Sequence, residues 1–234
     1  MLVQLEHVMK EYGSFALELN MQIPENQIIG LIGANGAGKS TTFKLMIGLI
    51  RPDQGNAEVF GRNAADLGAE EKQKIGVVFS DSGFSEYLRV QQLIPVMKRF
   101  YPDFQEKEFR KKCERILDLL REYMEIPGRT IVISSHISGD LEHFCDDLYM
   151  IHEGKIVLHE ETDRILEEYG FLKVSEQEYE VLDKEYLLRV RKESFGYSCL
   201  TDQKKYYLEN YPGLVVEKGS VDEVISMLVK GEAL

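Results

Sequence analysis

Gly33-Ala34-Asn35-Gly36-Ala37-Gly38-Lys39-Ser40-Thr41 fits the pattern G-x-x-x-x-G-K-[ST] of a phosphate-binding loop at every fixed position. The apolar run Ile28–Ile32 precedes this stretch, and a helix is expected over 39–47. Strand, loop and helix in this order are the context that the motif requires, so the sequence predicts that the chain binds a nucleoside triphosphate.

The residue types of this loop suit a triphosphate. Glycines let successive backbone N–H groups point inward and form an anion-binding concavity, and the helix that starts near Gly38 directs its positive end to the same place. We expect Lys39 to reach the β- and γ-phosphates, Ser40 to supply one Mg²⁺ ligand and Thr41 to add a phosphate contact. The predicted nucleotide-binding residues of the loop are Gly33, Asn35, Gly36, Ala37, Gly38, Lys39, Ser40 and Thr41.

The composition describes an ordinary globular chain with an acidic surface. Of its 234 residues 44% are hydrophobic and 29% are charged, and 28 Lys and Arg against 40 Asp and Glu give a net charge of −12. That balance argues against a nucleic-acid partner. No apolar run approaches the length of a membrane-spanning helix, and the first residues do not have the pattern of a signal peptide. The three cysteines, 113, 145 and 199, are widely spaced and are expected as free thiols in a reducing cytoplasm.

Hydrophobic periodicity predicts an α/β fold. Strands alternate with helices around the phosphate loop, which indicates a P-loop type, mainly parallel sheet with an antiparallel N-terminal flank. The predicted strands are 2–7, 15–20, 28–32, 57–60, 75–79 and 130–134; the predicted helices are 39–47, 104–124 and 140–147; and 148–158 is a predicted hairpin.

Residues 163–234 differ in amino-acid composition from the residues before them. They are predicted to form a small C-terminal α/β appendage that follows a nucleotide-binding domain over 1–162. The segment is acidic at its start and rich in tyrosine later. A strand is expected over 186–191, a helix over 202–210, and a helix opened by the capping box Ser220–Glu223. The tyrosines are interpreted as the core of the appendage.

Residues 1–170 resemble the nucleotide-binding subunit of an ABC transporter beyond the phosphate loop. The glycines and proline that follow the loop helix, Gly48, Pro52, Gly55 and Gly61, match this family. Tyr12 occupies the position of an aromatic that stacks on adenine in the family, and a π-face is suited to that role. The stretch 130–136 resembles the strand that ends in the family's switch histidine, so the resemblance implies a catalytic role for His136 next to the γ-phosphate.

The resemblance implies more than the residues themselves establish. Its cofactors would be ATP and Mg²⁺, and its partners an integral-membrane permease and a second ATP-binding subunit, as a homodimer or heterodimer. The chain would lie in the cytoplasm, peripheral on the inner face of the membrane. Residues 163–234 are similar to C-terminal extensions of the multidrug and peptide-antibiotic export type.

Two departures from the family pattern affect the chemistry. Where the family carries a Mg²⁺-binding glutamine, this chain has Ser80 and Asp81, so Asp81 is the candidate cation ligand. The L-S-G-G-Q signature and the Walker B strand, four apolar residues followed by Asp-Glu, do not occur between Phe79 and Thr130. The domain is therefore interpreted as internally shortened near 115–120. Either the chain carries a deletion, or the natural polypeptide holds a segment that this sequence lacks.

Three function classes follow. The favoured one is the ATP-driven subunit of an exporter, and the alternative is a nucleotide-binding, hydrolysis-deficient regulatory or degenerate subunit. Loss of the acidic pair would remove the group that activates water, which lowers hydrolysis by about 10²- to 10⁴-fold. A soluble ABC-type ATPase of translation or DNA repair is disfavoured by the single phosphate loop and the acidic charge.

Overall fold

The structure is a computed structural model that describes residues 1–78, 90–135, 139 and 141–232. The chain divides into two units, which are described separately: residues 1–66 with 130–234, and residues 67–129.

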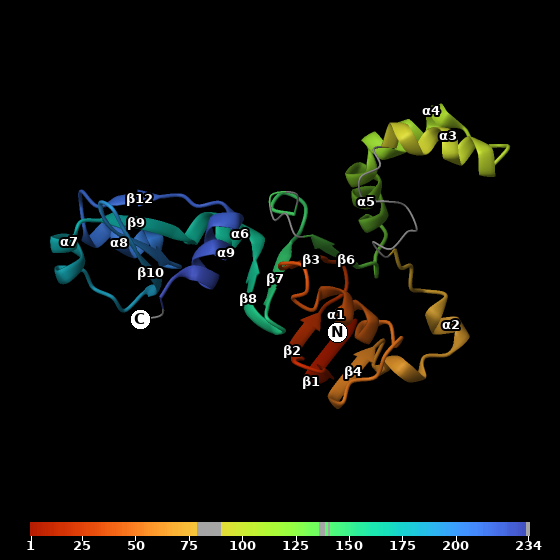
Figure 1. The fold of residues 1–234 in the computed structure, drawn as a ribbon, viewed down its shortest axis with the longest axis horizontal. Coiled ribbons are helices and arrows are strands. Elements are labelled where there is room, and N and C mark those ends of the chain that lie inside the picture. Colours follow the sequence, from red (N-terminus) through yellow and green to blue (C-terminus); the bar gives the residue numbers. More distant parts are fainter. Residues whose placement is uncertain (79–89, 136–138, 140, 233–234) are drawn as a thin grey trace. The chain divides into compact units, whose positions relative to one another are not determined.

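The first unit contains a large mixed sheet. In the described residues its strand order is β5-β4-β1-β2-β8-β7-β3-β6. The strands are β1 (Val3–Tyr12), β2 (Phe15–Ile23), β3 (Ile28–Ile32), β4 (Gln54–Val59), β5 (Arg62–Asn63), β6 (Ile131–Ser135), β7 (Asp147–His152) and β8 (Lys155–Glu161). β3 is parallel to both β6 and β7, β2 is parallel to β8, and β5-β4-β1-β2 is an antiparallel flank. Figure 1 shows β1, β2 and β4 side by side. The predicted fold class is confirmed.

β3 is the strand that delivers the phosphate loop. All five of its residues are buried, as expected for an apolar strand with parallel neighbours on both sides. The loop leaves its carboxyl end and leads into α1 (Lys39–Met46), which buries Thr42, Leu45 and Met46. The predicted helix over 39–47 is therefore confirmed.

β6 is the last strand on its side of the sheet. It pairs with β3 over five residues, and within the described part of the chain no strand pairs with its other edge. Four of its five residues are only half-buried and Ser134 is exposed. In the described part of the chain β6 is therefore an edge strand of low burial.

The predicted strand over 75–79 is wrong for residues 75–78, which belong to no strand; Phe79 lies outside the described residues. Val77 is 41% exposed and Val78 96% exposed. A short apolar run is stable as a strand only when neighbouring strands pair with it, and the described residues offer no such neighbour here.

The predicted helix over 140–147 is also wrong. Asp140 lies outside the described residues, residues 141–144 form a turn, and Asp147 starts β7. Asp146 exchanges two hydrogen bonds with Ile28, through its backbone N–H (2.8 Å) and its carboxylate (2.7 Å). This pairing with the end of β3 holds the chain extended, and tertiary structure here overrides local helix propensity.

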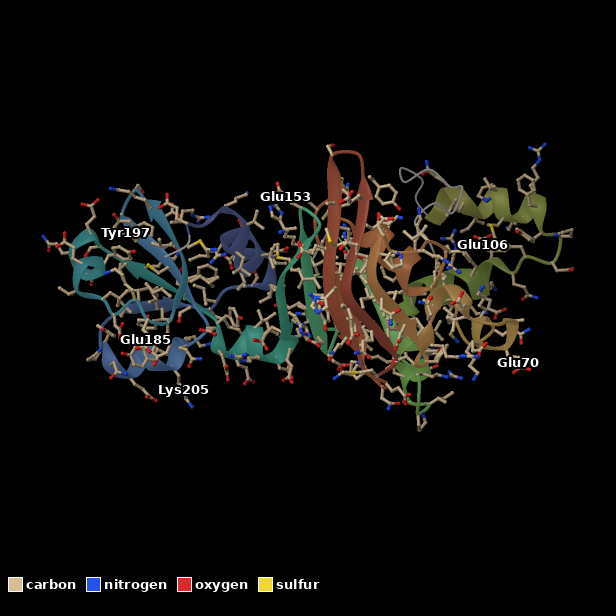
Figure 2. The ribbon with its side chains drawn as sticks, turned by 90° about the horizontal axis from the view of Figure 1, so that it is seen from below. Glu70, Glu106, Glu153, Glu185, Tyr197 and Lys205 are labelled. Carbon is tan, nitrogen blue, oxygen red and sulfur yellow. The ribbon has the colours of Figure 1, made fainter. Side chains whose placement is uncertain are left out.

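A second sheet follows α6 (Thr162–Glu168). Its order is β10-β11-β9-β12 in the described residues, and it packs with α7 and α8 around a tyrosine-rich core, while α9 lies against β10. Tyr197, labelled in Figure 2, stacks on Tyr179 with ring centroids 4.2 Å apart. The elements are β9 (Gly170–Val174), α7 (Glu176–Val181), β10 (Leu187–Glu193), β11 (Gly196–Thr201), α8 (Lys204–Asn210), β12 (Val215–Glu217) and α9 (Val221–Lys230).

The α/β character of this C-terminal part and its tyrosine core are confirmed. The capping box is present as well, because Ser220 Oγ accepts from the Glu223 N–H at 3.3 Å and the Ser220 N–H donates to Glu223 Oε2 at 2.9 Å. The domain boundary at 162/163 stays a prediction.

The second unit is helical. It contains α2 (Ala69–Lys72), α3 (Val90–Phe100), α4 (Glu106–Glu114) and α5 (Ile116–Met124), and a short 3₁₀ turn (Ala64–Asp66) precedes it. The single helix predicted over 104–124 is wrong, because the backbone breaks at Arg115, with φ −117° and ψ 21°. The apolar periodicity continues across this break and gives no sign of it. The predicted join near 115–120 stays a prediction.

Within the described residues, no helix is both long and apolar enough to cross a membrane.

Candidate nucleotide-binding site

The loop between β3 and α1 follows a path that glycine permits. Gly38, the N-cap of α1, has φ 116°, and a Cβ placed on it would lie 2.5 Å from Cδ1 of Leu17. A Cβ on Gly33 would lie 2.4 Å from the carbonyl oxygen of Ile151. Both distances are far inside van der Waals contact, so larger residues at these two positions would displace the strands that support the loop.

The start of α1 presents unpaired donors. Among the described residues, none accepts a hydrogen bond from the backbone N–H of Gly38, Lys39 or Ser40. The first turn of α1 carries no acidic side chain that would neutralise its positive end. Residues 34–36 and Ser40 are exposed, Lys39 is half-buried and Gly38 is buried, so one side of the loop is open to solvent. The arrangement favours an anion with several oxygens.

Lys39 adds a full charge at the same place. Its Nζ donates to the carbonyl oxygens of Gly33 at 2.6 Å and Ala34 at 3.0 Å. Partial burial lowers the pKa of the Lys39 ammonium from its usual range. The ammonium is therefore held over the loop by neutral carbonyl dipoles, and a phosphate oxygen would be a stronger acceptor for it.

The hairpin between β7 and β8 is hydrogen-bonded to the phosphate loop. The Gly154 N–H donates to the Ala37 carbonyl at 3.1 Å, and the Gly154 carbonyl accepts from the Glu18 N–H at 2.7 Å. Gly154 has φ 79°, and a Cβ on it would lie 2.0 Å from the Ala16 carbonyl oxygen. The sequence predicted a hairpin here but not its contact with the loop, because pairing over more than a hundred residues leaves no local signal.

Tyr12 lies at the end of β1 and is 47% exposed. Its register partner on β2 is Phe15, and Cζ of Phe15 lies 3.3 Å from the position of a Cβ on Gly38. The hairpin that carries Tyr12 is therefore packed against the phosphate loop. Its exposed ring is available to a planar group.

The cation site is only partly described. The Ser40 side chain is exposed in the first turn of α1, and Asp81 lies outside the described residues. No group of three or more His, Cys, Asp or Glu side chains in the described part could hold a metal ion. A single hydroxyl fits a Mg²⁺ ion that takes its remaining ligands from phosphate oxygens and water.

His136 also lies outside the described residues. The strand before it ends at Ser135, whose register partner is Ile32, the residue that precedes the loop. β6 therefore ends at the same edge of the sheet at which β3 leads into the phosphate loop.

The family model for ABC transporters matches residues 17–177. The chain belongs to the ABC transporter family. The match includes the phosphate loop, α1, β6 and the β7–β8 hairpin.

Two ABC transporter relatives are ATP-binding proteins of antibiotic-peptide transport. The lantibiotic transport ATP-binding protein SrtF of Streptococcus pyogenes is 27% identical over 213 residues, with 69% of this chain and 92% of SrtF covered. The bacitracin transport ATP-binding protein BcrA of Bacillus licheniformis is 24% identical over 210 residues, with 67% of this chain and 68% of BcrA covered. Both names support the predicted recognition as an ATP-binding subunit of an ABC transporter.

Solved structures agree on the ABC fold. The chain is similar to cbiO1 of Clostridium perfringens, part of the ABC transporter complex cbiONQ, with a TM-score of 0.50, 20% sequence identity, and 70% of this chain and 90% of that chain covered. The structure of an ATP-binding subunit of an ABC transporter gives a TM-score of 0.50 at 21% identity, with 70% and 92% covered.

The alignments with SrtF and BcrA have more positions than the number of residues that this chain contributes to them. The SrtF alignment has 213 positions but includes only 69% of 234 residues, so about fifty positions of SrtF have no counterpart here. The BcrA alignment, with 210 positions and 67% of the chain, differs by about the same amount. Within the aligned region these ABC relatives therefore contain about fifty positions that this chain does not.

Proposed function

We propose that this chain is the ATP-binding subunit of an ABC exporter, in which ATP binding and hydrolysis drive transport by a partner membrane permease. The observation that carries the proposal is the loop of residues 33–41: none of the described residues accepts from the N–H groups at the start of α1, and the Lys39 ammonium is held by the carbonyls of Gly33 and Ala34. SrtF and BcrA are named for lantibiotic and bacitracin transport, which supports a role in transport; the export direction is inferred from the resemblance of residues 163–234 to the C-terminal extensions of export-type subunits.

The remaining parts of the proposal follow the family. ATP would bind with Mg²⁺, for which Ser40 and Asp81 are the candidate ligands, and His136 would stand near the γ-phosphate. The base would stack on Tyr12. The chain would act as a homodimer or heterodimer of ATP-binding subunits on the cytoplasmic side of the membrane, attached through the permease.

Purification from native membranes tests the partner. A tagged wild-type chain, solubilised in mild detergent, is expected to bring down one integral-membrane protein in stoichiometric amount. The variant Lys39→Ala is the control, because it should lose ATP and keep the membrane partner. Recovery of the chain without any membrane protein would contradict the proposed coupling.

A specific observation favours a second candidate, a subunit that binds ATP but hydrolyses it poorly. No apolar run ending in Asp-Glu occurs between Phe79 and Thr130, and within the described residues β6 has a neighbour on one side only. About fifty positions of the relatives have no counterpart. Without a carboxylate that activates water, turnover should be lower by about 10²- to 10⁴-fold.

The two candidates are separated by steady-state ATP hydrolysis of three proteins under one condition: this chain, SrtF, and this chain with the unmatched positions of SrtF inserted. The second candidate predicts ATP binding in all three and turnover only in SrtF and the chimera. Turnover of the unaltered chain at the rate of SrtF, abolished by Lys39→Ala, would support the exporter motor as it stands.

A further inference from the structure

Asp53 joins the loop before β4 to the end of β1 by three contacts. Its Oδ1 lies 2.7 Å from Nζ of Lys10, its Oδ2 accepts from the backbone N–H of Glu11 at 2.8 Å, and its own N–H donates to the Met9 carbonyl at 2.8 Å. These contacts hold three consecutive residues of β1, directly before Tyr12. The hydrogen bond from Lys10, and then that from Glu11, lower the pKa of the Asp53 carboxyl, so the group is charged at neutral pH.

Lys10 in turn stands over the ring of Tyr12. Its Nζ lies 5.9 Å from the ring centroid, within the range of a cation–π contact. The Lys10 side chain is only 18% exposed, against 44% for Asp53. The ammonium is therefore fixed between a carboxylate and an aromatic ring, and that ring is still 47% exposed.

Tyr12 needs such support. It is 47% exposed at the tip of a hairpin and is followed by Gly13 in a left-handed conformation, with φ 59°. An exposed ring at a hairpin turn must lose side-chain freedom before it can stack on a ligand. A neighbour that already restricts the ring reduces that loss and so strengthens binding.

We propose that Asp53, acting through Lys10, is a positioning residue that holds Tyr12 ready for the nucleotide base and so makes the site prefer nucleotides to bare polyphosphate. This inference rests on the proposed nucleotide-binding function. It also assigns Lys10 to the base end of the site: while Asp53 pairs with it, its charge is directed at a carboxylate and an aromatic ring, not at the phosphates.

Equilibrium titration of the full chain with two probes, Mg-ATP and Mg-tripolyphosphate, tests the inference. Tyr12→Ala should weaken ATP binding by about 5- to 150-fold, the range of one base–aromatic stack. Asp53→Asn should weaken ATP binding by about 3- to 10-fold, the range of an exposed cation–π contact and ion pair. Both variants should bind tripolyphosphate within about twofold of the wild type, since the phosphate loop is unchanged.

Asp66→Asn is the matched control. Asp66 is also an exposed aspartate of the same unit, paired with Arg51 at 2.9 Å, and it has no contact with β1 among its described interactions. The substitution Asp66→Asn removes the same charge as Asp53→Asn and should leave the affinities for Mg-ATP and Mg-tripolyphosphate unchanged. Should Asp53→Asn not fold, Lys10→Met keeps the aliphatic stem, removes the ammonium and carries the same prediction.

The double variant Tyr12→Ala/Asp53→Asn shows whether Asp53 affects ATP binding through Tyr12. If Asp53 acts through Tyr12, the second substitution adds no further loss of ATP affinity. Equal weakening of ATP and tripolyphosphate by Asp53→Asn, or full additivity in the double variant, would overturn the inference and leave the proposed function intact. Absence of saturable ATP binding by the wild type would overturn both.

Discussion

Lys39 closes over its own loop, with its Nζ 2.6 Å from the carbonyl oxygen of Gly33. Because this contact joins an ammonium to a neutral carbonyl, phosphate oxygens should replace the carbonyls when a triphosphate binds. Lys39→Ala is expected to weaken ATP binding by about 10- to 150-fold, the range of a lost charge-assisted hydrogen bond. Isothermal titration calorimetry measures this loss of ATP affinity. Lys44→Ala is the control, since Lys44 is an exposed lysine in the last turn of the same helix; equal losses in the two variants would contradict the assignment.

Gly38→Ala should damage the loop more than its backbone strain alone explains. Gly38 and Gly61 both have positive φ, 116° and 71°, but only Gly38 has a side chain, Leu17, within 2.5 Å of a new Cβ. Gly61→Ala should cost about 1 to 2 kcal/mol of stability. Gly38→Ala should cost about 1 to 3 kcal/mol more, from overpacking, and should also weaken ATP binding. Urea unfolding compares the free energies of unfolding of the two variants. Equal losses would show that the contact between the new Cβ and Leu17 is relieved.

The link between Asp53 and Lys10 should depend on pH in one direction. Its contacts hold the folded-state pKa of Asp53 below the ordinary value of 3.8. The contribution of the charged carboxylate is therefore fully present above that value and is lost as the pH falls through the lowered pKa. The stability difference between the wild type and Asp53→Asn should be constant from about pH 7 to pH 5 and should shrink below about pH 3.8. A difference that grows toward acid would contradict this assignment.

Two thiols should be inert in the folded chain. Cys145 and Cys199 are buried, and burial raises the pKa of each to about 12. At pH 8 only about one thiol in ten thousand would then be a thiolate. In a Cys113→Ser variant, iodoacetamide should label neither cysteine before unfolding and both in urea, as read by intact mass. If iodoacetamide labelled the native chain as fast as the chain in urea, the two cysteines would be accessible in the folded state, which would contradict the prediction.

The phosphate loop was predictable because its chemistry is local. The spacing of Gly33, Gly38 and Lys39 encodes the loop geometry directly, and the five apolar residues before it encode β3. The capping box at Ser220 and Glu223 is another local signal, and it is present as predicted.

Errors occurred where distant partners decide the structure. Val77 and Val78 are β-branched, but a strand needs a neighbour, and the described residues provide none. Residues 141–147 have helical composition, yet Asp146 pairs with Ile28 across the sheet. The break at Arg115 interrupts a smooth apolar pattern. The support of Tyr12 by Asp53 spans more than forty residues and leaves no trace in local spacing.

Binding of ATP by residues 33–41 is best measured by equilibrium dialysis of the purified wild-type chain against labelled Mg-ATP. We expect saturable binding of one ATP per chain, displaced by excess tripolyphosphate and reduced in Lys39→Ala. Absence of saturable binding, or binding that Lys39→Ala leaves unchanged, would contradict this expectation.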